Sequence, residues 1–330
     1  MPPFTPRLIV EPDDGIQPVR EFIESAQKSL VIKQFNFTEE SLIQSVIARI
    51  NAGVDVRVML NAKRSDGGRV NDETYERFAA AGISVKWSSP RFYVTHEKSI
   101  VVDEKAAMVA TFNLNLKYFS RTRDYAVITH DPQHVAQIIE VFDIDWDQRD
   151  ATPAAYEGLL WSNSNSRLHM ANFIDMAQHR LDVQHPKYVD AVILDRIAAA
   201  AERGVKVHVL CGGRHGISDW DVLDTFASLR TLRRFGGVKV HKQKNLRVHA
   251  NLLIVDNERA LLGSMNIDRS AFDLRRELGV TITDPSVLAR LRETFDTDWD
   301  LSQHYDPPDP LDRSQHVETD FPHDPDLVHE

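Results

Sequence analysis

An internal repeat constrains the fold of this chain more than any other feature of its sequence. The segment FDIDWD at 142–147 returns as FDTDWD at 295–300, with five of six residues identical at an offset of 153. The same offset aligns HEKSIVVDEKAAMVATFN (96–113) with HANLLIVDNERALLGSMN (249–266) without a gap. Because fixed-offset similarity indicates repeated structural units, we expect two similar halves packed about a pseudo-twofold axis, with the two His-bearing segments meeting at the interface.

Each half alternates helix-like and strand-like segments. In 41–60 and 192–211, aligned at an offset of 151, the apolar residues follow helical spacing up to a glycine, and an alternating strand comes next. Strand-like runs precede both helices. This alternation predicts an α/β fold. We place an N-terminal half at 1–152, a C-terminal half at 153–304, and an acidic, proline-rich tail outside the core at 305–330.

Composition is typical of a soluble globular protein. The chain has 330 residues, a formal net charge of −10 and one cysteine, Cys211, which excludes an internal disulfide framework. We see neither a signal peptide nor an apolar run long enough to span a membrane, so we expect a cytoplasmic protein. Lys and Arg are dispersed, which disfavours a nucleic-acid partner. Nothing in the sequence indicates an oligomeric state.

The two aligned segments share a set of polar residues that packing alone does not require. The matched pairs are His96 and His249, Asp103 and Asp256, Asn113 and Asn266, and Asp124 and Glu277. Two facing imidazoles can divide a displacement reaction, since one attacks the electrophile while the other protonates the leaving group. The later acid of each set can fix the tautomer of an imidazole by accepting a hydrogen bond.

Other residues of the two segments suit an electrophile with several anionic oxygens, such as a phosphodiester. Lys98 supplies positive charge, Asn113 and Asn266 are neutral donors, and Thr111 and Ser264 add hydroxyls. A metal site is disfavoured because an ammonium two residues from the histidine would repel a cation, and a lone cysteine forms no zinc cluster. The sequence therefore predicts neither a metal nor a cofactor.

The paired segments resemble the HxKx4Dx6GSxN signature of the phospholipase D superfamily, and the resemblance extends from about residue 8 to 303. It implies two α/β halves with one active-site cleft between them, and a metal-independent, two-step phosphodiester exchange through a phosphohistidine. The resemblance makes His96 the nucleophile and His249 the general acid and base. The remaining roles are phosphate binding for Lys98, Asn113, Ser264 and Asn266, orientation of the imidazoles for Asp124 and Glu277, and a buttress behind the motifs for Asp103 and Asp256.

The sequence departs from this signature in both halves. The first motif ends in Ala110-Thr111 where the family has Gly-Ser, which keeps a hydroxyl. In the second motif Asn251 stands where the second phosphate-binding lysine is expected, which keeps a donor and loses its charge. Three interpretations stay open: the site works with one lysine, helped by Arg247 or Lys244; it is weakened or retuned; or Asn251 is an engineered substitution.

The substrate class follows less directly. An acidic, duplicated single chain favours a phospholipid or another phosphodiester, with peripheral membrane contact. Three aromatic residues before the first motif (Trp87, Phe92 and Tyr93) fit a cleft lining, a membrane contact or loop packing, and GGRHG at 212–216 fits a flexible basic loop at the cleft rim. Two alternatives remain, namely a nuclease or nucleic-acid phosphodiesterase, and a phosphate-binding homologue with little or no activity.

Overall fold

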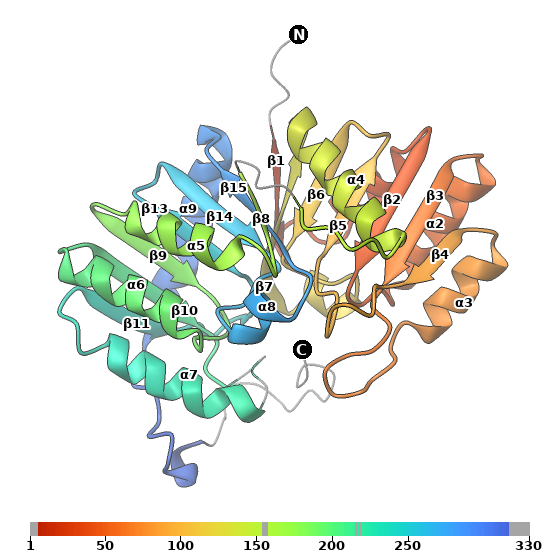
Figure 1. Cartoon of the computed structure of the whole chain (residues 1–330). Coiled ribbons are helices and arrows are strands. Elements are labelled where there is room, and N and C mark those ends of the chain that lie inside the picture. Colours follow the sequence, from red (N-terminus) through yellow and green to blue (C-terminus); the bar gives the residue numbers. More distant parts are fainter. Residues whose placement is uncertain (1–5, 154–157, 215–216, 218, 317–330) are drawn as a thin grey trace.

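The computed structural model describes residues 6–153, 158–214, 217 and 219–316, and it confirms a duplicated α/β fold (Figure 1). The N-terminal half contains β1 (Arg7–Glu11), α1 (Gln17–Glu24), β2 (Ser29–Gln34), α2 (Glu40–Asn51), β3 (Asp55–Leu60), α3 (Asp72–Ala80), β4 (Ser84–Trp87), β5 (Ser99–Val102), β6 (Ala106–Ala110), the 3₁₀ helix η1 (Leu116–Phe119), β7 (Thr122–Thr129) and α4 (Pro132–Trp146). The C-terminal half contains β8 (Leu159–Trp161), α5 (Ser166–Asp175), β9 (Arg180–Gln184), α6 (Ala191–Glu202), β10 (Lys206–Cys211), α7 (Asp219–Leu232), β11 (Val238–Lys242), β12 (Arg247–Val248), β13 (Leu252–Val255), β14 (Arg259–Gly263), α8 (Arg269–Asp273), β15 (Leu278–Ile282), α9 (Pro285–Asp300), β16 (Gln303–His304) and η2 (Arg313–Gln315).

The two sheets have corresponding strand orders. The first runs β1-β7-β6-β5-β2-β3-β4, and the second runs β8-β15-β14-β13-β9-β10-β11 with β16 added beyond β11. In both halves three strands pair in parallel at one side of the sheet, and the antiparallel strands of the aligned motifs follow. The order confirms that the repeat in the sequence is a repeat of the fold.

The predicted helices form where the apolar stripes lie. Helix α2 buries Leu42, Ile43 and Val46, and the chain leaves it through Gly53 at a φ of +84°. Helix α6 is followed by Gly204 at a φ of +89°. Glycine adopts this left-handed conformation without the steric cost that a Cβ would add, so the two glycines end the helices as predicted.

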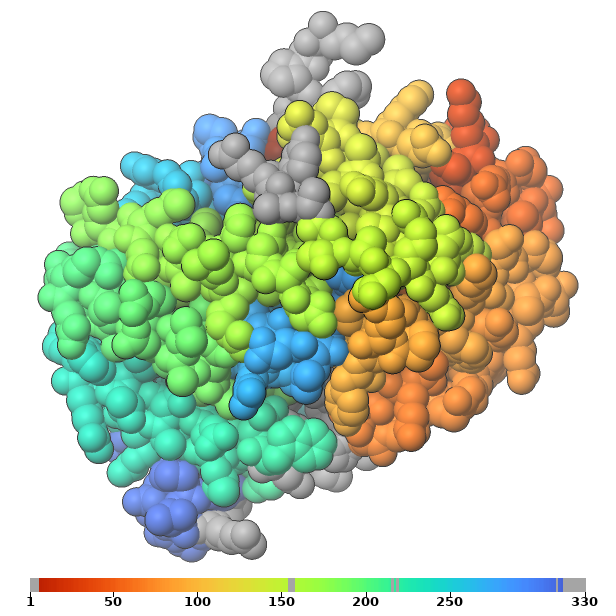
Figure 2. Space-filling view, viewed as in Figure 1, coloured from red at the N-terminus to blue at the C-terminus, as the bar shows by residue number. Residues whose placement is uncertain are grey.

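The protein has apolar cores on the outer sides of its sheets and a further core between the halves. Helices α1, α2 and α3 cover the first sheet, and α5, α6 and α7 cover the second. Between the sheets, apolar side chains of α4 and α9 pack with residues of both halves, including Val127 and Val280. Figure 2 shows the N-terminal half, in red to yellow, joined to the green and blue C-terminal half in one continuous body. The large shared core holds the halves in a fixed relation.

Backbone pairing also crosses between the halves, immediately before each motif histidine. Strand β12 of the C-terminal half pairs in parallel with β7 of the first sheet, with Val248 opposite Arg123. At the matching place Thr95 forms a parallel bridge with Arg276. The backbone N–H of His96 donates to the Arg276 carbonyl at 2.8 Å, and that of His249 donates to the Arg123 carbonyl at 3.3 Å. Each histidine is therefore placed beside the strand of the opposite half.

Ion pairs across the interface explain the repeated acidic motif at the ends of α4 and α9. Arg276 of the C-terminal half donates from Nε and Nη2 to the two oxygens of Asp145, both at 2.9 Å. Arg123 of the N-terminal half binds Asp298 in the same forked way, at 2.8 and 3.0 Å. All four residues are buried. The second Asp of each FDxDWD segment therefore anchors the arginine that directly precedes the opposite half's acid.

The start of the predicted tail lies on the surface of the C-terminal half. The Tyr305 N–H donates to the Val240 carbonyl at 2.9 Å, and Arg233 pairs with Asp306. Residues 317–330 of this predicted tail lie outside the described residues.

Among the helices of the part that is described, none combines the length and the apolar character needed to cross a membrane.

Candidate active site

The two motif histidines and their acids form two hydrogen-bonded pairs, and each pair takes one member from each half. His96 Nδ1 lies 2.9 Å from Glu277 Oε2, and His249 Nδ1 lies 2.7 Å from Asp124 Oδ1. The acids thus contact the imidazoles, as the sequence predicted, but each acid serves the histidine of the other half. This pairing between halves follows from the backbone crossings, because the backbone N–H of His96 is hydrogen-bonded to Arg276, the residue that precedes Glu277.

The surroundings of His96 fix its tautomer. Its Nδ1 is also 3.0 Å from the Ser264 carbonyl oxygen, which can only accept a hydrogen bond. Nδ1 therefore carries the hydrogen, and the lone pair of the neutral ring is on Nε2. This Nε2 is buried and has no hydrogen-bond partner among the described residues. Phe35 contacts the ring edge to face at 4.7 Å. The arrangement presents an oriented, unprotonated nitrogen.

Burial and nearby cations keep His96 neutral. Burial lowers the pKa of His96 well below its ordinary value, and the positive charges of Lys98 and Arg275 lower it further. Burial also raises the pKa of Glu277 to about 8, while the charges of Arg275 and Lys98 act in the opposite direction. Both shifts favour the uncharged form of a buried group. At neutral pH His96 is therefore available as a nucleophile.

The second pair is held by hydroxyl groups. Thr111 Oγ1 donates to Asp124 Oδ1 at 2.6 Å, and Thr122 Oγ1 donates to Asp124 Oδ2 at the same distance. Tyr118 lies against the His249 ring, with centroids 4.6 Å apart. His249 is partly exposed, in contrast to His96. Its position suits a group that exchanges protons with a bound molecule.

The hydroxyls of Thr111 and Ser264, which the sequence assigns to phosphate binding, both have protein partners in this structure. The only hydroxyl hydrogen of Thr111 is donated to Asp124, and its oxygen accepts from the Tyr125 N–H at 2.9 Å. The Ser264 hydroxyl donates to the Leu278 carbonyl at 3.4 Å and accepts from the Leu278 N–H at 3.1 Å. Since a hydroxyl has one hydrogen to give, Thr111 supports Asp124, whereas Ser264 binds the backbone of Leu278, the residue after Glu277.

The cationic and amide residues of the motifs are buried beside the histidines. Lys98 Nζ donates to the His96 carbonyl at 2.8 Å and lies 5.2 Å from the centre of the Phe35 ring. Asn113 and Asn266 are buried at the matching places after β6 and β14. Asn251 Nδ2 donates to the Gly263 carbonyl at 3.3 Å. Thus Lys98 brings a charge to the first half of the site, and Asn251 brings none to the second.

The two motif aspartates bind backbone at the opposite end of the adjacent strands. Asp103 accepts from the N–H groups of residues 27, 28 and 29, which lead into β2. Asp256 accepts from residues 178, 179 and 180, which lead into β9. Burial acts to raise the pKa of both carboxyls, but the three backbone hydrogen bonds and a nearby positive charge together hold the pKa of each below its ordinary value. The aspartates thus hold the motif strands against their neighbours and do not contact the histidines.

The aromatic residues before the first motif have different environments. Trp87 stacks on Tyr75 at 4.2 Å, and Phe92 packs under the Arg276 guanidinium at 4.2 Å. Only Tyr93 is largely exposed, at 60%. In the GGRHG loop, Gly212 and Gly213 are buried and Arg214 is exposed, while residues 215 and 216 lie outside the described residues.

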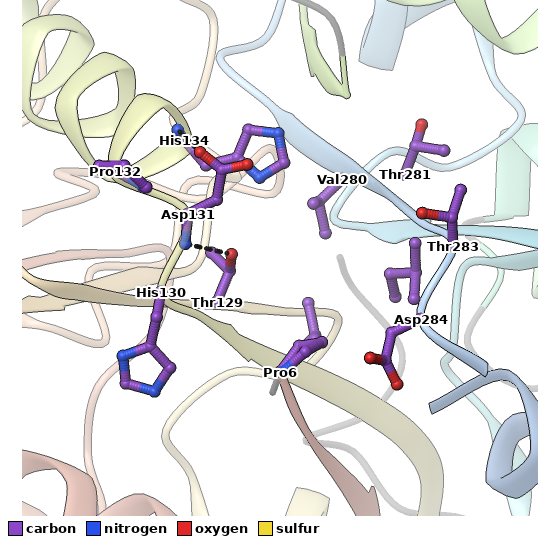
Figure 3. A pocket seen from close by; sticks show the side chains of 12 residues that line it. Pro6, Thr129, His130, Asp131, Pro132, His134, Val280, Thr281, Thr283 and Asp284 are labelled. Carbon is purple, nitrogen blue, oxygen red and sulfur yellow. Dashed lines mark hydrogen bonds between the residues drawn. The ribbon is translucent and has the colours of Figure 1, made fainter. Parts of the chain in front are cut away.

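A cavity of about 510 Å³ lies at the far ends of β7 and β15 and is distinct from the histidine site. Figure 3 shows Thr129, Asp131 and His134 on one side of it, facing Thr281 and Asp284 on the other. Asp124 and Glu277 lie at the starts of the same strands, so roughly 15 Å of strand separates the cavity from the histidines.

In the described part of the chain, no cluster of three His, Cys, Asp or Glu side chains is arranged to bind a metal ion.

Sequence reasoning missed two features of this site. The Arg276–Asp145 and Arg123–Asp298 pairs were hidden in the repeat, although the matched arginines at the repeat offset were a usable signal. Arg275 was also missed, because its counterpart at the offset of 153 is Thr122 and the repeat drew attention to matched residues only.

Comparison with known proteins identifies the family. The family described as "Cardiolipin synthase, PLD-like domain" matches residues 19–146 and 170–299. A cardiolipin synthase of Staphylococcus aureus (strain Mu50 / ATCC 700699) is 23% identical over 328 residues, which cover 88% of this chain and 65% of that protein. Cardiolipin synthase 2 of Staphylococcus epidermidis (strain ATCC 35984) is 25% identical over 238 residues, covering 63% of this chain and 48% of that protein. The chain thus spans less than two thirds of the length of these relatives.

Solved structures support the fold. Phosphatidylserine synthase of Haemophilus influenzae Rd KW20 superimposes with a TM-score of 0.72 at 15% identity, over 95% of this chain and 90% of that one. Polyphosphate kinase of Porphyromonas gingivalis gives a TM-score of 0.73 at 17% identity, over 92% of this chain and 48% of that one. At these identities the similarity establishes the duplicated fold.

Proposed function

Because the chain belongs to the phospholipase D-like family of cardiolipin synthase domains, we propose that it is a phosphatidyl-transferring phosphodiesterase that needs no metal. The observation that carries this proposal is the pair of histidines, each hydrogen-bonded through Nδ1 to an acid of the opposite half. Two such pairs at one interface provide the nucleophile and the proton donor that a two-step displacement requires.

In the first step His96 Nε2 attacks the phosphorus of a phosphodiester. The new N–P bond forms as the bond between phosphorus and the leaving alcohol oxygen breaks, and His249 gives its Nε2 proton to that oxygen. Glu277 accepts a hydrogen bond from His96 Nδ1–H at 2.9 Å, so the positive charge that develops on the ring favours the ionised form of this carboxyl and is stabilised by it. Lys98 and the amides of Asn113 and Asn266 stabilise the charge on the phosphoryl oxygens.

In the second step the phosphohistidine is resolved by an acceptor hydroxyl. His249, now neutral, removes the proton of the acceptor while its oxygen forms a bond to phosphorus and the N–P bond breaks. Asp124 Oδ1 accepts a hydrogen bond from His249 Nδ1, with the two atoms 2.7 Å apart, and keeps this ring oriented in both steps. Water as acceptor gives hydrolysis, and an alcohol gives transfer.

A phospholipid is the substrate class that we propose. The relatives named cardiolipin synthase and phosphatidylserine synthase point to this class. Two exposed apolar side chains near the site also suit a lipid surface: Leu274 lies two residues before Arg276, and Tyr93 donates its N–H to the Leu274 carbonyl at 2.9 Å. We therefore propose a peripheral contact with the membrane.

A cavity next to the first motif offers room for an anionic headgroup. It measures about 410 Å³, and its lining includes Asn36, Asn115 and the cationic residues Arg64, Lys117 and Arg121. Asn115 follows Asn113 by two residues, which links this cavity to the site. Opposite charge at the wall of a polar cavity raises the local concentration of an anionic substrate.

The proposal is tested with phospholipid vesicles and with a panel of soluble phosphodiesters, each assayed with and without a chelator. We expect headgroup release or exchange with an added alcohol, no effect of the chelator, and a substrate-derived phosphoryl label on His96. His96→Ala should remove turnover and label together, while the exposed Arg269→Gln should change neither. Turnover that persists in His96→Ala would overturn the mechanism. Absence of turnover on every lipid, with cleavage of oligonucleotides instead, would favour the nuclease alternative.

A further inference from the structure

Arg275 is a buried arginine with two nitrogens, Nε and Nη1, whose hydrogen-bonding capacity the described residues do not use. It is 4% exposed, and its Nε and Nη1 have no hydrogen-bond partner among the described residues. The nearest carboxylates lie beyond hydrogen-bond distance, with Asp268 at 3.9 Å and Glu277 at 4.0 Å from Nη1. The adjacent Arg276, by contrast, binds Asp145 with two hydrogen bonds and the Ser162 carbonyl with a third. Buried guanidinium groups are normally hydrogen-bonded, so the two nitrogens of Arg275 that lack a hydrogen-bond partner among the described residues require an explanation.

The position of Arg275 is inside the catalytic arrangement. Its Nη1 lies 4.0 Å from Glu277 Oε1, and the other oxygen of Glu277 is 2.9 Å from His96 Nδ1. The charge of Arg275 acts on His96 and on Glu277, as does the charge of Lys98 from the other half. Arg275 and Lys98 are thus cations of opposite halves that both act on the nucleophile.

Arg275 has no arginine counterpart in the N-terminal half. At the offset of 153 the counterpart of Arg275 is Thr122, which donates to Asp124 at 2.6 Å. The arginine therefore stands only in the half whose motif has Asn251 in place of lysine. Lys187 is a weaker candidate, because it is already paired with Asp221 at 3.0 Å and lies 3.5 Å from Asp268.

We propose that Arg275 binds a non-bridging oxygen of the substrate phosphate and replaces the lysine that the second motif lacks at Asn251. The inference rests on the proposed function, since it takes a phosphate group as the ligand. A guanidinium suits this role because its planar donors can bind two phosphate oxygens at once, and because it stays charged in a buried site. The site then has one cation from each half, Lys98 and Arg275, even though the second lysine is absent.

The test uses the full chain as Arg275→Gln, Arg275→Lys, Asn251→Lys and the double variant Arg275→Gln/Asn251→Lys. Arg269→Gln is the matched control, since it removes the same charge from an exposed position six residues earlier. Binding of inorganic phosphate is measured by calorimetry, and turnover is measured with bis(p-nitrophenyl) phosphate. Circular dichroism and thermal unfolding establish that each variant is folded.

We expect Arg275→Gln to weaken phosphate binding at least about tenfold and to lower kcat/KM by about 10² to 10³. Arg275→Lys should lie between Arg275→Gln and the wild type, and Arg269→Gln should match the wild type. Asn251→Lys should restore much of the loss in the Arg275→Gln background and gain much less on its own, because the two cations would serve the same phosphate.

The outcomes separate this inference from the proposed function. Phosphate binding that depends on Arg275 in a protein without turnover would contradict the function and keep the inference. Turnover with a folded Arg275→Gln that binds phosphate like the wild type would keep the function and overturn the inference. If Arg275→Gln does not fold, an Arg275→Lys variant with wild-type kinetics, or an equal gain from Asn251→Lys in the wild-type and Arg275→Lys backgrounds, would also overturn it.

Discussion

His249 differs from His96 in exposure and in the hydrogen bonds that its acid accepts, and these differences fit the separate chemical role that we propose for it. Its partner Asp124 accepts two hydroxyl hydrogen bonds in addition to the hydrogen bond from His249 Nδ1. Because Nδ1 of His249 is hydrogen-bonded to Asp124, Nε2 is the nitrogen available for proton exchange with the substrate. The role predicted for His249 therefore depends on the leaving group, which a suitable substrate can reveal.

We predict that His249→Ala lowers turnover of an ordinary alkyl phosphodiester by about 10² to 10⁴, because the leaving alkoxide loses its proton donor. With a p-nitrophenyl diester, whose leaving group needs no proton, the first step should survive and the second should be slow. Rapid-quench kinetics should then show a burst of p-nitrophenol equal to the enzyme concentration. Equal losses for both leaving groups, without a burst, would contradict the assignment.

Glu11 is a second buried acid at this end of β7, and it is uncharged at neutral pH. It is fully buried, lies opposite Asp124 in the β1–β7 register, and neither carboxyl oxygen has a hydrogen-bond partner among the described residues. Burial raises the pKa of Glu11 to about 9, and the negative charges of Asp124 and Asp14 add to the shift. The protonated form is thus the stable one in the folded protein.

The raised pKa has a defined consequence for stability. The folded chain holds a proton on Glu11 that the unfolded chain releases near pH 4.5. The contribution of this protonated group to the free energy of unfolding is therefore complete below about pH 4.5 and is lost as the pH rises through about 9. In the wild type, Glu11 should therefore lower the free energy of unfolding by about 1.4 kcal/mol per pH unit in this range. We predict that Glu11→Gln folds normally at pH 7 and lacks this pH dependence. Urea unfolding between pH 6 and 9 measures the slopes. Glu21→Gln, an exposed acid of α1, is the control and should keep the wild-type slope.

At the scale of elements, the ends of α4 and α9 connect the shared core to the catalytic strands. Asp145 binds Arg276, and the Arg276 carbonyl accepts from the backbone N–H groups of His96 and Glu97 at 2.8 and 3.0 Å. Lys33 adds a buried ion pair to Asp145 at 2.8 Å. A helix of the N-terminal half thus positions the backbone that carries both His96, the nucleophile that we propose, and Glu277.

We predict that Asp145→Asn destabilises the fold by about 3–5 kcal/mol, because it leaves the buried charges of Arg276 and Lys33 without their shared partner. In the folded fraction, kcat should also fall, since the strand that carries Glu277 is no longer held. Asp143→Asn in the same motif is the control. Asp143 pairs with Arg57 in a partly exposed position, so its loss should cost less than about 1 kcal/mol. Similar unfolding free energies for both variants would contradict this role of Asp145.

The sequence predicted the elements of this fold better than it predicted their partners. Periodicity and the two glycines located α2 and α6, since both signals act within a few residues. The acids and histidines were also found, because the repeat marked them. Which acid meets which histidine was not readable, since it depends on the β12–β7 and Thr95–Arg276 crossings between segments more than 120 residues apart. The hydrogen bond from the Thr111 hydroxyl to Asp124 was not readable either, because Asp124 lies on the following strand.

At the scale of the whole molecule, one site needs both halves of one chain. Both His–acid pairs, both forked Arg–Asp pairs and the core between α4 and α9 join residues of the two halves within a single polypeptide. Duplicated halves can in principle exchange between two copies, because each half offers the other the same type of surface. Exchange would combine His96 of one copy with Glu277 of another.

The two arrangements are distinguished by mixing inactive chains. We predict that His96→Ala and His249→Ala, unfolded together in denaturant and refolded as a mixture, recover no phosphodiesterase activity. The reason is that the halves of one chain meet at the high effective concentration set by their short connection, so each folded unit contains one defective histidine. Refolded wild-type protein is the control for recovery from denaturant. Activity in the mixture well above that of either variant alone would mean that halves pair between chains, and that the site belongs to a dimer.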